Sequence, residues 1–324
     1  MVLVMAAVFS FSALGQTTNE GIFKLALPDH RGQLQWSADG FKIIQSSAKP
    51  NGNEIGIRAK DESGHLTFLG FLFLVPEQAP LTTAKCRDGA LDPEKKSNPT
   101  LKISATSDKT QSGSTLPVSV VNYSAKSRDG GTVYMVRSFV ASGDMCGDLE
   151  FYSNTPIGAD DADLKKILGS YRLDESYSPK FEDALLYAQV LYQNHQYRAA
   201  APIFEIASAR LSEKSGAEKR TMRRVVTDQA GMAYGISGDI PKARAIFEKA
   251  ISEDPDYPMY YYNLACADAE EKNLAGARKH LQEAFARKAN VIPGESMPDP
   301  KSDDSFRPYS NDKEFWTFLE SLHP

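Results

Sequence analysis

Three cysteines and five histidines are the most reactive residues of this 324-residue chain, so they are the first candidates for chemistry. The histidines are scattered, and none belongs to an HExxH motif. The motifs GxGxxG, GxxxxGKS/T and GxSxG do not occur, and acidic clusters such as "DDAD" lack the spacing of a calcium-binding loop. We therefore expect a non-enzymatic protein with no catalytic residue, metal site or cofactor. A hydrolytic enzyme is the alternative, and it would need Asp, Ser and His residues from distant segments to meet in one cleft.

The cysteines divide between the two halves of the chain. Cys86 and Cys146 lie in the first half, which is rich in strand signals, and they could form a disulfide in an oxidising compartment. Cys266 lies in an alanine-rich helical segment and is expected to be a small buried apolar residue. Because there is no CxxC pattern, the cysteines do not predict a zinc site.

The chain opens with "MVLVMAAVFSFSALGQ", an apolar run of about 13 residues that is too short to span a bilayer. Ala13 and Gly15 are small residues at the positions that a signal peptidase requires, which predicts cleavage between Gly15 and Gln16. Residues 1–15 are thus expected to be a signal peptide of a periplasmic or secreted protein, whose mature chain has no transmembrane span. An uncleaved interfacial helix or a buried first strand is the alternative.

The composition is typical of a core-forming protein, with 41% hydrophobic residues and enough length for two domains. The net charge of −5 comes entirely from the part after residue 173. This charge argues against a nucleic-acid binder or a protein that binds anionic membranes. The oligomeric state does not follow from the sequence.

The first half consists mainly of strand signals. The segments "EIGIRAK" and "HLTFLGFLFLV" flank the polar turn "DESG" and predict a hairpin. Further strands are expected at "FKIIQSS", "TLKISATS", "PVSVVNYSA", "TVYMVRSFVASG" and "CGDLEFYS". Two helices are expected, a weak one at "PEQAPLTTAKC" and a better one at "DADLKKILGSY" behind Asp160 or Asp161 as cap. An antiparallel sheet with helices packed on it is an α+β domain.

The order of "TVYMVRSFVASGDMCGDLEFYS", "DDADLKKIL" and "GSYRL" resembles the PsbP/Mog-type fold, a domain of about 150 residues found in many exported proteins. In that family a long strand pair is followed by a helix and a closing segment. The resemblance implies an accessory or binding domain, and it brings no catalytic residues.

The second half carries a periodic pattern of small and aromatic residues within "GMAYGISGDIPKARAIFEKAISEDP". Its positions are Gly231, Tyr234, Gly238, Ala243, Phe247, Ala250 and Pro255. This is the pattern of the tetratricopeptide repeat (TPR), in which two antiparallel helices are joined by a short turn. Small residues are needed because the helices approach closely, and a bulkier side chain would force them apart.

The pattern recurs 34 residues later, which is the repeat length of the TPR family. The matching residues there are Ala265, Ala277, Leu281 and Ala284. An earlier copy, 43 residues upstream, has Ala188, Leu191, Ala200, Phe204 and Ala207. Longer helices or a polar loop at "RLSEKSGAEKRTMRR" would accommodate the extra residues. The chain therefore resembles a TPR protein with three repeats; a helical bundle with coincidental spacing is the alternative.

The end of the chain is expected to cover the last repeat. Phe315, Phe318, Leu319 and Leu322 follow helical spacing behind Asn311 or Asp312 as cap. A solenoid leaves an apolar face uncovered at its last repeat, and such a helix would bury it. The segments "NLACADAEEKNLAGARKHLQEAF" and "DDSFRPYSNDKEFWTFL" resemble the TPR end-of-group family.

The expected organisation is a signal peptide at 1–15, an α+β domain at 17–173, a linker at 174–180, three repeats at 181–289 and a loop with a capping helix at 290–324. We expect an interaction scaffold that binds a peptide or protein partner, with no nucleic acid involved. The residues expected to be exposed in the groove of the repeats are Gln189, Tyr192, Gln193, Asp228, Met232, Tyr262 and Glu270.

The alternative function is binding of a small ligand or lipid by the sheet domain, with the repeats recruiting it to a complex of the cell envelope. This alternative predicts an apolar pocket beside "FLGFLFLV". A filled core at that strand would argue against it.

Overall fold

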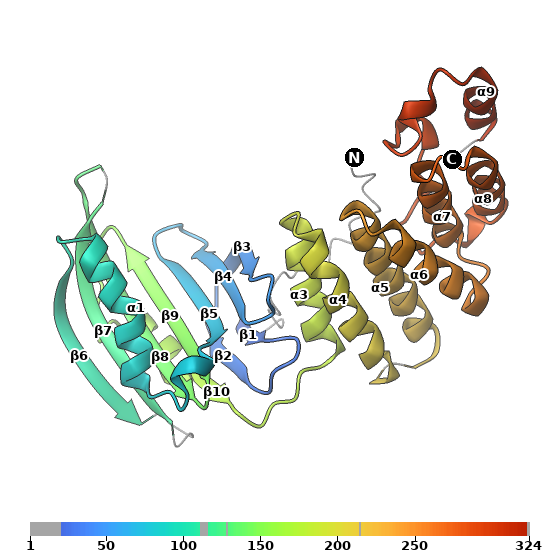
Figure 1. Cartoon of the computed structure of the whole chain (residues 1–324). Coiled ribbons are helices and arrows are strands. Elements are labelled where there is room, and N and C mark those ends of the chain that lie inside the picture. Colours follow the sequence, from blue (N-terminus) through green and yellow to red (C-terminus); the bar gives the residue numbers. More distant parts are fainter. Residues whose placement is uncertain (1–20, 111–115, 128, 214, 323–324) are drawn as a thin grey trace. The chain divides into compact units, whose positions relative to one another are not determined.

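The computed structural model describes residues 21–110, 116–127, 129–213 and 215–322 (Figure 1). The described residues form two compact units that divide between Asn194 and His195. The first, here called the sheet unit, holds antiparallel sheets with helices, and the second, the repeat unit, is helical, so the chain has the expected α+β class. The expected signal peptide at 1–15 lies outside the described residues.

The sheet unit contains a large antiparallel sheet with the strand order β3-β4-β5-β9-β8-β7-β6 in the described residues. Its strands are β3 (Phe41–Ala48), β4 (Glu54–Asp61), β5 (Thr67–Leu74), β6 (Lys102–Thr110), β7 (Pro117–Lys126), β8 (Thr132–Ser142) and β9 (Met145–Ser153). Each overlaps a segment that the sequence predicts as a strand. The "DESG" turn joins β4 to β5 as expected, and Gly64 there has a φ of 71°.

A second, smaller sheet was not predicted. It consists of β1 (Ile22–Ala26), β2 (Gln33–Ser37) and β10 (Arg172–Asp174), with β2 in the middle. Trp36 on β2 packs directly on Gly70 of β5, where an added Cβ would lie 2.6 Å from the indole. Glycine at this point of an otherwise apolar strand therefore lets the two sheets approach each other.

Aromatic rings fill the space between the two sheets. The Phe68 ring on β5 lies 5.0 Å from Phe23, 5.6 Å from Trp36 and 5.7 Å from Phe151, measured between centroids. Phe68 and the neighbouring Leu72 are both fully buried. This face of "FLGFLFLV" is therefore the filled core that argues against the small-ligand alternative.

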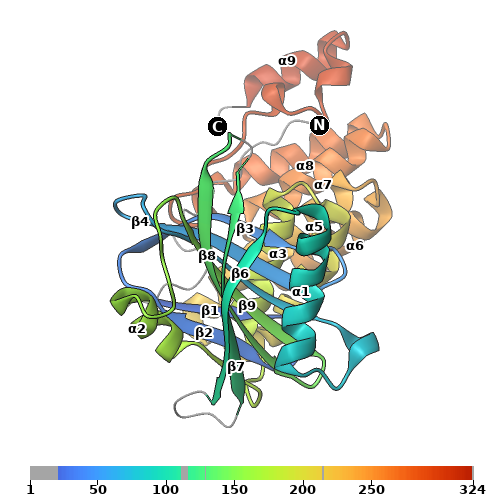
Figure 2. The same ribbon diagram turned by 90° about the vertical axis from the view of Figure 1, so that its left-hand side faces the viewer.

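Helix α1 (Thr83–Ser97) covers the opposite face of the large sheet, over β7, β8 and β9 (Figure 2). The weak helix expected at "PEQAPLTTAKC" overlaps α1 only in its last four residues, because its first three form the short 3-10 helix η1 (Pro76–Gln78). Cys86 and Cys146 are bonded as a disulfide that joins α1 to β9, with Cα atoms 5.9 Å apart. Leu91 anchors the rest of the helix in the same apolar cluster.

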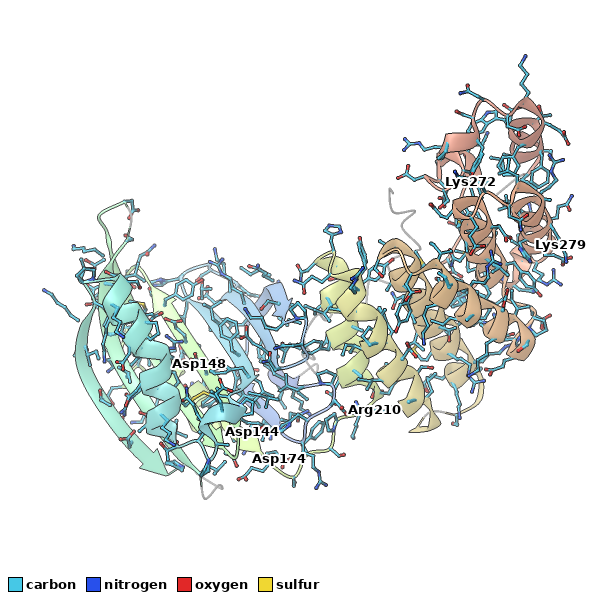
Figure 3. All side chains as sticks on the ribbon, in the orientation of Figure 1. Asp144, Asp148, Asp174, Arg210, Lys272 and Lys279 are labelled. Atoms are coloured by element: carbon cyan, nitrogen blue, oxygen red, sulfur yellow. A yellow bond between two sulfur atoms is a disulfide. The ribbon has the colours of Figure 1, made fainter. Side chains whose placement is uncertain are left out.

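A buried charged network lies on the α1 face of the sheet. Arg137 on β8 donates hydrogen bonds to Asp148 on β9, from Nε at 2.9 and 3.1 Å and from Nη2 at 2.6 Å. Asp148 is labelled in Figure 3. The Nη1 atom of Arg137 lies 3.2 Å from Glu94 of α1. Glu150 accepts a hydrogen bond from Tyr123, and burial raises the pKa of Glu150 while Arg137 opposes that rise. The Arg137 guanidinium thus links a carboxylate of β9 to a carboxylate of α1.

Two further helices belong to the sheet unit. Helix α2 (Ala162–Ser170) begins behind Asp161, whose carboxylate accepts hydrogen bonds from two backbone amides, as predicted. Helix α3 (Phe181–Gln193) carries the first half of the first predicted repeat. Its Tyr187 hydroxyl donates to the carbonyls of Lys49 and Glu54 at 2.7 and 2.8 Å, next to the β3–β4 turn. These contacts explain why α3 groups with the sheets, although the repeat pattern starts at residue 181.

The repeat unit is a series of antiparallel helices in which each packs on the next. Its helices are α4 (Tyr197–Ala209), α5 (Gly216–Ile236), α6 (Ile240–Glu253), α7 (Pro258–Glu270), α8 (Leu274–Ala286) and α9 (Lys313–Ser321). Ala200, Ala243 and Ala277, which hold the same place in the repeat pattern, are at most 2% exposed. The small residues are therefore at the helix contacts, as the TPR pattern requires.

The turns between paired helices repeat a backbone conformation. His195, Gly238 and Lys272 have φ values of 59°, 91° and 62°, and they stand at the recurring positions of the pattern. Lys272 is labelled in Figure 3. Asp239 and Asn273 follow two of these turns and accept hydrogen bonds as N-caps of α6 and α8. The shared left-handed residue shows that the three turns are structurally equivalent.

Gly231 and Gly235 on α5 give a direct test of the helix packing. An added Cβ at Gly231 would lie 2.3 Å from the buried Phe247 ring, whereas at Gly235 it would lie 3.6 Å from Ala243 Cβ, an ordinary contact. Gly231→Ala is therefore expected to destabilise the repeat unit by about 1–3 kcal/mol. Gly235→Ala is expected to stabilise it by about 0.5–1 kcal/mol, because alanine favours helix. Urea unfolding followed by circular dichroism at 222 nm measures both; shifts of the same sign would contradict the close α5–α6 contact.

The chain after α8 folds back on the last repeat. We call residues 291–312, between the 3-10 helix η3 (Lys288–Asn290) and α9, the tail; it includes η4 (Pro300–Ser302) and η5 (Arg307–Tyr309). Helix α9 begins behind Asp312, whose carboxylate accepts a hydrogen bond from Phe315 N at 3.0 Å. Phe315 and Leu319 are buried in the core of the repeat unit, which confirms the predicted capping helix.

Candidate functional site

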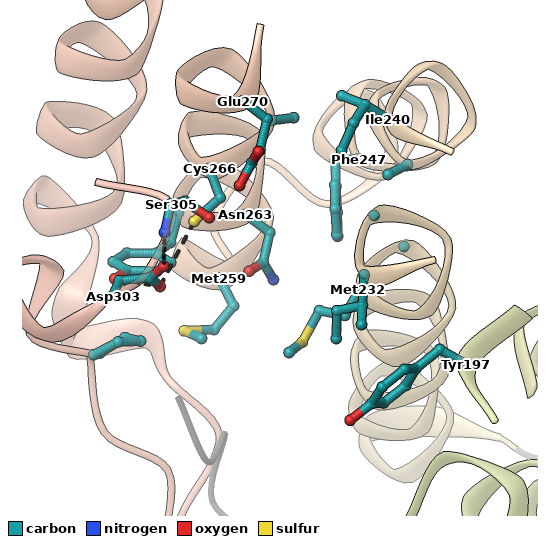
Figure 4. A pocket seen from close by; sticks show the side chains of 17 residues that line it. Tyr197, Met232, Ile240, Phe247, Met259, Asn263, Cys266, Glu270, Asp303 and Ser305 are labelled. Carbon is teal, nitrogen blue, oxygen red and sulfur yellow. Dashed lines mark hydrogen bonds between the residues drawn. The ribbon is translucent and has the colours of Figure 1, made fainter. Parts of the chain in front are cut away.

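A cavity of about 310 Å³ lies between α5, α6, α7 and the tail (Figure 4). We call it the repeat cavity. It is lined by Tyr197, Gly231, Met232, Gly235, Ile236, Ile240, Ala243, Phe247, Met259, Tyr262, Asn263, Cys266, Ala267, Glu270, Pro298, Asp303 and Ser305. All of these belong to the repeat unit, so the cavity is contained in one compact body.

The apolar wall comes from three helices. Met232 of α5 is half-buried, while Met259 of α7 and Phe247 of α6 are each 2% exposed. The two methionines lie on opposite sides of the cavity in Figure 4. Because a thioether side chain is flexible and polarizable, it adapts to apolar groups of different shapes. This wall is suited to accept an apolar side chain.

The polar wall is formed where the tail meets α7. Asp303 accepts hydrogen bonds from the Tyr262 hydroxyl at 3.1 Å and from Ser305 N at 2.9 Å. Burial raises the pKa of Asp303, and these hydrogen bonds oppose the rise. Cys266 Sγ lies 3.8 Å from the same carboxylate, and burial raises the pKa of this thiol well above its usual value. The thiol is therefore not activated as a nucleophile.

A second buried carboxylate lies behind the α5–α7 contact. Asp228 is 3% exposed and accepts a hydrogen bond from Asn263 Nδ2 at 2.6 Å. Burial raises its pKa strongly, with a further contribution from the nearby charge of Glu295. Glu295 of the tail itself accepts a hydrogen bond from the Tyr257 hydroxyl at 2.8 Å. Two acidic groups, Asp228 of α5 and Glu295 of the tail, thus accept hydrogen bonds from residues of α7 or its N-cap.

Of the seven residues expected in the groove, Met232, Tyr262 and Glu270 line the repeat cavity. Asp228 lies behind it, in contact with Asn263. The three residues Gln189, Tyr192 and Gln193 lie on α3 in the sheet unit and do not line this cavity. Their part in binding stays a prediction.

Two of these residues are not exposed as the sequence led us to expect. Tyr262 is 1% exposed because the tail covers it: its ring packs edge-on against Phe306, and its hydroxyl binds Asp303. Asp228 is buried because it faces Asn263 of the next repeat. Cys266, expected to be buried, is half-buried at the cavity wall.

Several lining residues were not identified from the sequence. Met259 and Cys266 follow the same face of α7 as the expected residues Tyr262 and Glu270, so extending the pattern from Tyr262 would have found them. Pro298, Asp303 and Ser305 come from the tail, which has no periodic pattern to place it. Only the folded chain brings these residues to the cavity.

Hollows elsewhere in the repeat unit have a different character. One of about 390 Å³ over α4, α5 and α6 is lined by charges of both signs, with Arg223 and Lys249 opposed by Glu205 and Glu253. Such mixed charge is typical of a solvated surface. The repeat cavity is therefore the better candidate for a binding site.

No protein-family model matches the chain, and no curated protein matches it. Among solved structures, the type III secretion translocator chaperone SycD of Yersinia enterocolitica is 19% identical, covers 46% of this chain and 96% of its own, and has a TM-score of 0.31. The Sgt2 TPR domain of Aspergillus fumigatus is 15% identical, with coverages of 45% and 86% and a TM-score of 0.32. Cyanobacterial PsbP of Synechocystis is 8% identical, with coverages of 49% and 96% and a TM-score of 0.35. TPR and PsbP-type structures are thus both among the neighbours, as the sequence resemblances indicated.

Two further features of the described residues bear on the site. None of the helices in the described ranges combines the length and apolar composition needed to cross a bilayer. Within the same ranges, His, Cys, Asp and Glu side chains do not gather in threes in a way that could hold a metal ion.

Proposed function

We propose that the protein is an interaction scaffold whose repeat cavity binds a peptide segment of a partner protein. The observation that carries this proposal is the apolar wall of Met232, Met259 and Phe247, which faces a cavity of about 310 Å³ with Glu270 exposed at its edge. Small apolar cavities with a few polar groups are the usual form of binding sites. Stacked helical repeats provide the rigid support that such a site requires.

Panning a random dodecapeptide phage library against the purified protein tests this function. Selected peptides are expected to bind Met232→Ala about tenfold more weakly, because the apolar contact at the centre of the site is lost. Met222→Ala is the matched control, since Met222 is a half-buried methionine of the same helix that does not line the cavity. Selection of no peptides, or equal affinity for both variants, would reject the proposed site.

We also propose that the protein is exported. The apolar leader at 1–15 and the bonded pair Cys86–Cys146 support this, because disulfides persist in oxidising compartments. N-terminal sequencing of the protein from its native source tests it: a mature chain starting at Gln16 supports export, and a retained Met1 contradicts cleavage.

A further inference from the structure

The carboxylates of the last repeat are paired with cations in most places, but not at the cavity. Asp268 of α7 lies 2.7 Å from Arg244 and 2.5 Å from His280. Glu271, at the end of the same helix, lies 2.6 Å from Arg244. By contrast, Glu270 makes no ion pair with any described residue, although it is the immediate neighbour of Glu271. Glu270 therefore lines the repeat cavity without a cationic partner among the described residues, whereas Glu271 is paired with Arg244 outside it.

Asp303 adds a second negative charge to the same cavity. It is 9% exposed, its partners are a hydroxyl, a backbone amide and a thiol, and it makes no ion pair within the described residues. Asp303 lies 3.8 Å from Cys266 Sγ, and Glu270 follows Cys266 by one turn of α7 and lines the same cavity. The 17 lining residues include these two acids and no lysine, arginine or histidine.

A cavity with charges of one sign and low-polarity walls focuses its field and attracts the opposite charge. The wall formed by Met232, Phe247 and Met259 is apolar, and the exposed carboxylate of Glu270 stands at the edge, where a charged group can keep part of its hydration. The charge and shape of the repeat cavity thus fit an apolar side chain with a cationic group beside it.

We infer that the partner segment carries a lysine or arginine next to an aliphatic or aromatic residue. The apolar side chain enters between Met232 and Met259, and the cation pairs with Glu270, with Asp303 adding attraction from behind. This inference rests on the proposed function and names the class of partner that the cavity selects.

The same phage library identifies the partner chemistry when it is panned in parallel on the full-length wild type and two variants. Wild type and Glu271→Gln are expected to enrich a basic residue beside an apolar one. Glu270→Lys is expected to enrich an acidic residue at that place instead. Glu271→Gln is the matched control, because Glu271 is an exposed glutamate adjacent in sequence that is paired with Arg244 outside the cavity.

Affinities of a selected peptide give the quantitative test. Glu270→Gln is expected to weaken binding about threefold and Glu270→Lys at least about tenfold, as a lost and a reversed ion pair at an exposed site would do. Changing the peptide's lysine to glutamate should restore binding to Glu270→Lys. Binding of the wild type should weaken between 50 and 500 mM NaCl more than binding of Glu270→Gln.

The outcomes distinguish a failure of this inference from a failure of the proposed peptide-binding function. Peptides that depend on Met232 but show no basic preference, or that tolerate Glu270→Lys, would overturn the inference and leave the peptide-binding function in place. A selected basic preference that is equally lost in Glu271→Gln would also overturn it. Absence of any peptide that depends on Met232 would instead reject the function.

Discussion

Replacing Arg137 with methionine is expected to destabilise the sheet unit by about 3–5 kcal/mol at neutral pH. Arg137 is the cation that faces Asp148, Glu150 and Glu94 beneath α1. Without it, Asp148 and Glu150, which lie two residues apart on β9, have no opposite charge beside them, and uncompensated buried charge is costly. Methionine keeps the length and apolar stem of the arginine, so the loss measures mainly the missing charge.

The loss should depend on pH in a defined direction. Burial already raises the pKa of Glu150, and Arg137 opposes that rise, so its removal raises this pKa further. A carboxyl with a higher pKa in the folded state than in the unfolded state binds protons on folding. Folding is then favoured as the pH falls through that window. The difference between wild type and Arg137→Met should therefore be largest near pH 7 and smaller near pH 4.5.

Fluorescence of Trp36 reports this unit if the other tryptophan is removed. Trp316 lies in α9 of the repeat unit, so urea unfolding is measured in a Trp316→Phe background. Arg58→Met is the control: Arg58 lies over the Tyr152 ring on the same sheet, and no carboxylate is found within ion-pair distance of it in the described residues. A loss equal to that of Arg58→Met, or one that does not change with pH, would contradict the role given to Arg137.

The large sheet and the repeats could be predicted because their signals are local. Runs of β-forming residues bounded by glycine turns placed the strands β3 to β9, and the recurring alanines placed the helix contacts at Ala200, Ala243 and Ala277. Long, strongly periodic segments are the part of a fold that sequence patterns specify best.

The small sheet and the extent of α1 depend on distant contacts. Strand β10 has three residues and pairs with β2, more than 130 positions earlier, so neither shows a signal of its own. Helix α1 continues past Gly89 and Pro93, which disfavour helix, because Leu91 and the bond from Cys86 to β9 fix it on the sheet. In both places tertiary contacts override local preference.

The binding site was predicted only in part, for the same reason. Met232 and Glu270 could be assigned to the cavity because their helices were recognised and their side is set by helical geometry. The tail is polar and irregular, and its contact from Asp303 to Tyr262 spans 41 positions. The tail buries Tyr262, which the sequence pattern led us to expect as an exposed aromatic anchor, and Tyr262 becomes part of the cavity wall. The sequence pattern cannot reveal this contact.

Removing the disulfide by Cys86→Ala and Cys146→Ala together is expected to destabilise the sheet unit by about 4 kcal/mol. The bond closes a loop with a sequence separation of 60, and the entropy that it removes from the unfolded chain grows with the logarithm of loop length. Urea unfolding of the Trp316→Phe protein, followed through Trp36, measures this loss.

Dithiothreitol acting on the parent protein should shift the midpoint by the same amount as the double substitution, because both remove the same cross-link. Cys266→Ala, which changes the remaining cysteine in the repeat unit, should leave the Trp36 transition in place. An unchanged midpoint after reduction would mean that α1 is held on β8 and β9 by its apolar contacts alone. We expect the opposite, since a helix with glycine and proline in its interior contributes little stability of its own and depends on the bond at its first turn.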